Sequence, residues 1–250
     1  MEYASLIGAV KTFLKNIPFK SKLQKFCGPK VPFGPHKLVE HNACCKSIRD
    51  LLNKNDTVPT AQIKYFEEGF RIDKNIWKKH YITPFKCTTD TSLQWLQYRI
   101  LHRILATNYL LTKMGIKDSE YCTFCGTHRE TIVHIFFDCS VVQDFLLDVS
   151  RYLLTRGGLH ITITKSKMIF GIPLNNKNKV INWVLLHCKK FIHNSRIRNK
   201  LLNVNCFWKI LEQEFISQRY ILLKNNKFQE FNMLWKPWSN TLLSNPPTVE

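Results

Sequence analysis

The chain has 250 residues, 44% of them hydrophobic and 12% aromatic, which is enough for a buried core and excludes a wholly disordered protein. Lysine and arginine number 37 against 18 aspartates and glutamates, and the resulting net charge of +19 favours a polyanionic partner, nucleic acid before an acidic membrane surface. No run of 18 apolar residues occurs, so we expect no membrane-spanning helix.

The cysteine content indicates the compartment. Nine cysteines are present, and the opening segment 1–13 is too short and too polar for a secretory signal. We therefore expect an intracellular protein, nuclear or cytoplasmic and not secreted, whose thiols are free or bound to metal. The positive charge is unevenly spread, because residues 151–250 contain 16 basic and only 4 acidic side chains.

Lysines and prolines dominate the start of the chain, and residues 1–55 are predicted to be a basic, partly ordered leader. Residues 60–77 are predicted to be mainly helical. Thr91–Gln94 then matches a capping box, and apolar residues recur every three or four positions after it. The pattern predicts one helix from Thr91 to Lys113, stopped by Gly115 and about 35 Å long.

The other face of this predicted helix carries Trp95, Arg99, His102 and Arg103. A tryptophan and two arginines on one face are suited to hold a phosphate backbone and to stack on an unpaired base. The same residues are equally suited to an outer face on which the arginines pair with carboxylates and the tryptophan packs on a neighbouring helix. Both interpretations stay open at this point.

Four potential metal ligands follow within 18 residues. Cys122, Cys125, His134 and Cys139 have the spacing C-x2-C-x8-H-x4-C, and thiolate and imidazole groups are the donors that a tetrahedral zinc ion prefers. All four positions are filled, which leaves no coordination site for water and indicates a structural Zn²⁺ ion. The alternatives are four buried free thiols and imidazoles, or His128 in place of His134.

Beyond the motif, Thr127–Glu130 and Ser140–Gln143 match two further capping boxes, which predict helices starting near residues 129 and 140. Residues 160–164 alternate and predict a short strand. Helical periodicity resumes at 179 and again over 205–224. The segment from 189 to 200 contains the strongest basic patch of the chain, a candidate phosphate-binding surface made of Lys189, Lys190, Arg196, Arg198 and Lys200.

These elements predict a mainly α fold: a helical domain with a small zinc knuckle and at most a few short strands. After the leader, we expect a helical zinc-binding module over 56–156, a basic helical region over 157–240 and a frayed tail over 241–250.

Two runs resemble a known family. Residues 93–108 precede Cys122–Cys125, and residues 130–139 follow it, as in the zinc-binding segment downstream of the reverse transcriptase in LINE-type (non-LTR) retrotransposon polyproteins. A looser similarity extends from Asn53 to Trp238. The resemblance implies a C-terminal fragment of such a polyprotein that binds element RNA or target DNA, with the upstream reverse transcriptase domain as a further partner. In that family the zinc ligands match Cys122, Cys125, His134 and Cys139.

The chain also departs from an intact element. No two aspartates are adjacent, as the paired-Asp polymerase motif requires, and an apurinic-type endonuclease domain is absent. A phosphate-binding glycine loop with a lysine is missing as well. We therefore expect a zinc-stabilised nucleic-acid-binding module, RNA or DNA, that is not an enzyme and has neither a membrane nor a small molecule as partner. The alternatives are a zinc-dependent protein-interaction module and a decayed element relic.

Overall fold

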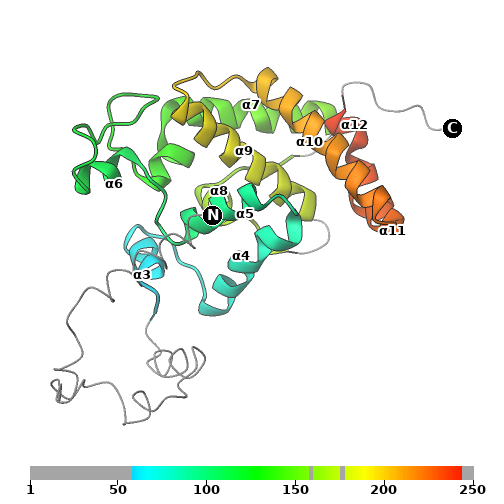
Figure 1. Cartoon of the computed structure of the whole chain (residues 1–250), viewed down its shortest axis with the longest axis horizontal. Coiled ribbons are helices and arrows are strands. Elements are labelled where there is room, and N and C mark those ends of the chain that lie inside the picture. The colour runs from blue at the N-terminus through cyan, green and yellow to red at the C-terminus, as the bar shows by residue number, and fades with distance from the viewer. Residues whose placement is uncertain (1–57, 158–159, 175–177, 244–250) are drawn as a thin grey trace, which may run out of the picture. The chain divides into compact units, whose positions relative to one another are not determined.

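Helices make up nearly all of the regular structure (Figure 1). The computed structural model describes residues 58–157, 160–174 and 178–243. Within these ranges the β-type pairing is one isolated antiparallel bridge, between Tyr121 and Arg129. The predicted mainly α fold is confirmed. The elements are α3 (Thr60–Glu67), α4 (Lys74–Cys87), α5 (Thr91–Leu101), α6 (Asn108–Lys113), the π-helical η3 (His134–Asp138), α7 (Ser140–Gly157), α8 (Lys165–Phe170), α9 (Lys179–Ile197), α10 (Val204–Lys224), α11 (Phe228–Glu230), the π-helical η5 (Phe231–Trp235), the 3-10 turn η6 (Lys236–Trp238) and α12 (Ser239–Leu242).

The predicted continuous helix from Thr91 to Lys113 is wrong. α5 ends at Leu101, Arg103 adopts a left-handed φ of 58°, and α6 starts only at Asn108. The interruption places the Leu105 side chain fully inside the core. Burying one leucine contributes about 1.5–3 kcal/mol, which exceeds the helix propensity of the few residues that leave the helix.

The start of α5 also differs from the prediction by one residue. Its N-cap is Asp90, whose carboxylate accepts a hydrogen bond from the Ser92 amide at 2.7 Å and forms an ion pair with Lys190 of α9 at 2.8 Å. Although partial burial raises the pKa of Asp90, the hydrogen bonds from Lys190 and Ser92 outweigh it and lower the pKa to about 2. The cap therefore also ties α5 to α9.

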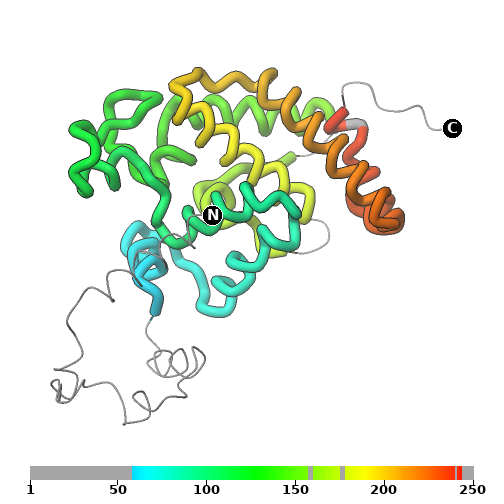
Figure 2. Tube along the Cα trace, in the orientation of Figure 1, coloured from blue at the N-terminus to red at the C-terminus, as the bar shows by residue number. Residues whose placement is uncertain are grey.

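α9 is the central helix of the core, and α4, α5, α10 and η3 all pack against it (Figure 2). One continuous cluster of buried hydrophobic residues extends along the chain from Tyr65 to Leu243. Its largest fully buried side chains include Trp183, Trp235, Phe136, Phe170 and Phe215. The predicted tail starts at 241, yet Leu242 and Leu243 are buried in this cluster. The predicted leader lies outside the described residues.

A glycine fixes the end of α8 on α9. Gly171 has a φ of +79°, and a Cβ atom there would lie 2.8 Å from Oδ1 of Asn182. The Asn182 amide hydrogen bonds to both the N–H and the carbonyl of Ile172, each at 2.8 Å. Only glycine combines this backbone conformation with such a close approach.

Three predicted helices are confirmed as α7, α9 and α10. The helix predicted near Arg129 starts three residues later, at Ile132, and continues into η3, because Arg129 pairs with Tyr121 across a loop. Residues 160–164 alternate in burial but form no strand, because none of the described segments pairs with them. In the described part of the chain, no helix combines the length and apolar character needed to cross a membrane.

Candidate metal centre

A tight loop holds Cys122 and Cys125. The Cys122 amide donates to the carbonyl of His128 at 2.8 Å, and the Gly126 amide donates to the carbonyl of Cys122 at 2.9 Å. Gly126 takes a φ of +68°, which turns the chain back toward the bridge at Arg129. The loop therefore presents both thiol groups from a single turn, as the C-x2-C spacing predicted.

The second pair of ligands comes from η3 and the residue that follows it, Cys139. His134 begins this π-helical turn, and the Cys139 amide donates to the His134 carbonyl at 2.9 Å, five residues back. Such single π turns often occur at functional sites. Ile135 and Phe136 on the same turn are fully buried, so the hydrophobic core fixes the turn that carries both ligands.

The four predicted ligands lie together. The Sγ atoms of Cys122 and Cys139 are 3.9 Å apart, Sγ of Cys125 is 3.4 Å from Nε2 of His134, and all four donor atoms lie within 4.8 Å of one another. Donors bound to a tetrahedral zinc ion at about 2.3 Å for sulfur and 2.0 Å for nitrogen would be about 3.5–3.8 Å apart. The donor set and its spacing therefore fit a zinc ion.

The imidazole of this cluster belongs to His134 and not to His128. The His128 ring stacks on that of His134 with centroids 5.5 Å apart, and its Nδ1 lies 2.9 Å from the Thr127 hydroxyl. His128 thus borders the cluster from outside.

Two of the thiols are poised to ionise. Burial raises the pKa of Cys125, but hydrogen bonds from Thr127 and His128 lower it to about 5. The hydrogen bond from Cys122 and the backbone N–H groups at the start of α7 lower the pKa of Cys139 to about 6, against the effect of burial. The pKa of Cys122 is raised, first by its hydrogen bond to Cys139 and then by burial. Thiolate is the form that binds metal.

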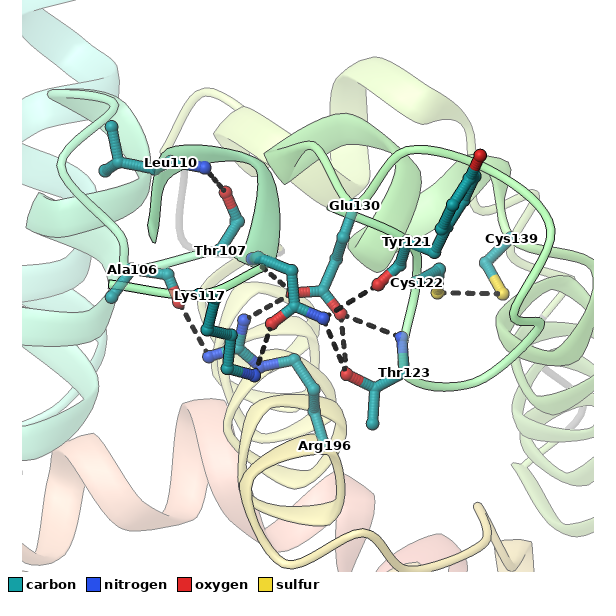
Figure 3. A network of polar contacts seen from close by, with 11 residues as sticks. Ala106, Thr107, Leu110, Lys117, Tyr121, Cys122, Thr123, Glu130, Cys139 and Arg196 are labelled. Carbon is teal, nitrogen blue, oxygen red and sulfur yellow. Dashed lines mark hydrogen bonds and ion pairs between the residues drawn. The ribbon is translucent and has the colours of Figure 1, made fainter. Parts of the chain in front are cut away.

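A buried carboxylate connects this loop to the rest of the fold (Figure 3). Glu130 is fully buried, and its two oxygens accept hydrogen bonds from the Asn108 amide at 2.7 Å, the Thr123 amide at 3.0 Å and the Thr123 hydroxyl at 2.8 Å. Arg196 of α9 supplies the counter-charge at 2.8 Å. Glu130 therefore joins the cysteine loop, the N-terminus of α6 and α9.

Sequence reasoning missed this role of Glu130, which it assigned to a capping box. The local pattern fits both readings, because a glutamate three residues after a threonine also occurs in loops. One feature of the sequence could have indicated this role: Glu130 lies between two predicted metal ligands, and a carboxylate that does not itself bind the metal there needs another partner.

The predicted basic patch is largely used by the fold. Lys189 has 1% of its surface exposed and donates to the side-chain carbonyl of Gln97, and burial lowers its pKa to about 7. Arg196 is bound to Glu130 and, at 2.8 Å, to the Ala106 carbonyl. Lys190 pairs with Asp90. Lys189 thus corrects the prediction, since a nucleic acid cannot reach it, and the guanidinium of the half-buried Arg196 is taken up by Glu130 and Ala106, whereas Arg198 and Lys200 are exposed.

The predicted face around Trp95 is divided between two roles. Trp95 and Tyr98 are 57% and 38% exposed, with parallel rings 5.0 Å apart, and the His102 ring follows 4.2 Å from Tyr98. Arg103 instead forms a two-point ion pair with Glu68, both contacts at 2.6 Å. The Nε atom of Arg99 is buried with no hydrogen-bond partner among the described residues. Arg103 thus follows the alternative in which the arginines pair with carboxylates, whereas Trp95 stacks on Tyr98 of its own helix and stays exposed.

A family model matches part of the chain. Residues 60–145 match a family model described as zinc-binding in reverse transcriptase. The match starts at α3, contains the four clustered ligands and Glu130, and ends inside α7. It supports the assignment of this segment to that domain family. No curated protein matches the chain.

Proposed function

We propose that the protein is a zinc-stabilised nucleic-acid-binding module, related to the segment downstream of the reverse transcriptase in LINE-type polyproteins. It binds RNA or target DNA without catalysis of its own. The zinc ion is structural: it fixes the loop around Cys122 and the turn η3, and the helices attached to them carry the binding surface. The family match over residues 60–145 and the four-ligand cluster support the first half of this proposal.

The observation that carries the binding half is the exposed ladder of rings on α5. Trp95 and Tyr98 lie with an angle of only 6° between their planes, and His102 extends the series. Aromatic side chains stacked in the open offer their outer faces to unpaired bases, and each stacked base contributes about 1–3 kcal/mol. A ring that served only the core would be covered, whereas more than half of Trp95 is exposed.

The cations available to phosphates are fewer than the net charge indicates. Besides the half-buried Arg99 of α5, the predicted cations that stay accessible are Arg198, Lys200 and the partly exposed Lys190, because Lys189 is buried and Arg196 and Arg103 are paired with Glu130 and Glu68. Lys190, Arg198 and Lys200 lie on α9 and the turn after it. α9 packs against α5, so the cations and the ring ladder are carried by neighbouring helices.

A second candidate function is protein binding. Phe85 is 59% exposed and lines an open apolar hollow with Trp95 and Tyr98, a surface that also suits a hydrophobic side chain of a partner protein.

The test is binding of single-stranded RNA and DNA across a salt series. Neutralised phosphates release counterions, so log affinity should fall linearly with log salt. Replacing Arg198 and Lys200 by alanine should lower the slope by about one for each lost phosphate contact, whereas Arg151→Ala on α7 should leave it unchanged. Affinity that does not change with salt would favour the protein-binding candidate.

A further inference from the structure

The groove between α9 and α10 has no part in the metal centre or the ring ladder. Its volume is about 270 Å³, just below the range of about 300–1,000 Å³ typical of drug-sized ligands, so it suits a single small group. α9, the turn after it and α10 all contribute to its wall, and these two helices lie against each other (Figure 1).

The floor of the groove is apolar and aromatic. Phe191 and Phe207 line it, with ring centroids 5.5 Å apart, together with Ile210 and Leu201. Leu201 is 88% exposed and Ile210 is 48% exposed, and no other described segment covers them. Exposing apolar side chains of this size to water is unfavourable. A flat, weakly hydrated ring is the kind of group that such a floor accommodates.

Polar groups that can read the edge of a ring stand beside this floor. Asn194 and Ser195 line the groove, and neither side chain is hydrogen bonded to another described residue. His187 also belongs to the lining, but it and Ser195 are buried, with 4% and 7% of their surfaces exposed, so Asn194 is the polar side chain that can reach a ligand. Its amide offers both a donor and an acceptor, which match the mixed edge of a nucleobase.

The charge along the groove is polarised. Arg198 and Lys200 lie at the turn between the helices, where the N-terminus of α10 adds its positive dipole. The acid of the lining, Glu214, lies about 16 Å away, eleven residues along α10 from Asn203. The carbonyls at the end of α9 are already bonded by the amides of residues 198 to 200. A ligand would therefore place an anionic group at the turn between the helices and a neutral ring deeper in the groove.

We propose that this groove takes one unpaired nucleotide, with the base on Phe191 and Ile210 and its phosphate at Arg198 and Lys200, the two cations that it shares with the surface proposed above. The inference rests on the proposed nucleic-acid-binding function and adds to it a preference for a looped-out base. Asn194 is the residue that contacts the base edge.

The test compares a hairpin with one looped-out nucleotide and the same hairpin fully paired, each as RNA and as DNA. The wild-type protein should bind the looped-out form on the order of tenfold more tightly, as one stacked base predicts. Asn194→Phe fills the groove and should abolish this preference while leaving the affinity for the paired hairpin unchanged. Gln213→Phe, an exposed position on α10 outside the lining, is the matched control and should keep the preference.

The exposed thiol of Cys206 gives a readout that does not require any variant to fold. Cys206 lines the groove, so the looped-out hairpin should slow its alkylation, followed by peptide mass spectrometry, and the paired hairpin should not. Equal binding of both hairpins, or equal alkylation of Cys206 with each, would overturn the groove proposal and leave the proposed function standing. Binding of neither hairpin would overturn both.

Discussion

Arg196 of α9 donates one hydrogen bond to the carboxylate of Glu130, at 2.8 Å, and another to the carbonyl of Ala106, also at 2.8 Å. The ion pair joins the Arg196 side chain, which is 9% exposed, to the fully buried side chain of Glu130. It fastens the loop of Cys122 and Cys125 to the central helix. The arginine that the sequence offered as a phosphate ligand is thus part of the framework of the metal centre.

Removing one member of this pair should destabilise the protein strongly. Glu130→Gln leaves the Arg196 charge buried without its counter-ion, and we expect a loss of about 3–5 kcal/mol in the free energy of unfolding, measured by urea denaturation. Glu130→Gln combined with Arg196→Met should recover part of this loss, because no unpaired charge remains. The control Asp148→Asn breaks the exposed pair with Arg151 and should cost at most about 1 kcal/mol. A single-variant cost as small as the control would contradict the framework role.

The buried ammonium group of Lys189 should make stability depend on pH. Burial lowers its pKa from 10.5 to about 7, so the unfolded chain holds this proton between those values while the folded protein has released it. Stability therefore rises with pH over this window, by up to about 1.4 kcal/mol per pH unit, and the destabilisation is fully present below pH 7. Lys189→Met removes the effect. The unfolding free energy of the wild-type protein should rise relative to that of Lys189→Met from pH 7 upward. If the two proteins show parallel dependence of unfolding free energy on pH, Lys189 does not have this role.

The sequence could predict the interactions between residues that are close in the chain, but not those between residues far apart in it. The four clustered cysteine and histidine residues are close in sequence, and their spacing alone predicted the cluster, as helical periodicity predicted α9 and α10. The patch from Lys189 to Lys200 failed as a uniform surface because its partners, Gln97, Asp90 and Glu130, lie 66 to 100 residues away in the chain. Local patterns carry no information on which charges the core will pair.

The same limit explains the broken helix. Leu105 continues the apolar period of α5, but it enters the core only after the chain has turned at Arg103, which is paired with Glu68, the residue just after α3. The periodicity gave the correct buried residues and the wrong backbone path. The role of Glu130 was hidden for a similar reason, since its partner Arg196 lies on a helix that starts 49 residues later.

The ring ladder predicts the effect of one exposed side chain on binding. Trp95→Ala should weaken binding of single-stranded RNA or DNA by about 1–3 kcal/mol, the loss of one stacked base, without changing the melting temperature, because Trp95 packs little. Tyr220→Ala on α10 is the matched control, an aromatic side chain that is 63% exposed and outside the ladder. Equal affinity losses for the two variants would argue against a dedicated platform.

Loss of the metal should unfold the region around Cys122 and η3. A chelator, or Cys125→Ser, should lower the melting temperature and expose Ile135 and Phe136, because a structural zinc site contributes its binding energy to folding, about 10–16 kcal/mol in small zinc modules. Cys206→Ser, at an exposed thiol outside the cluster, should behave as wild type. Hydrogen exchange would localise the change, and protection that survives the chelator would show that the core alone holds this region.

The most direct test of the central claim, a zinc ion that organises this fold, is X-ray absorption at the zinc edge on the purified protein. The cluster predicts one zinc per chain in a shell of three sulfurs near ~2.3 Å and one nitrogen near ~2.0 Å. A shell of nitrogen and oxygen alone, or a protein that melts normally with no zinc bound, would contradict it.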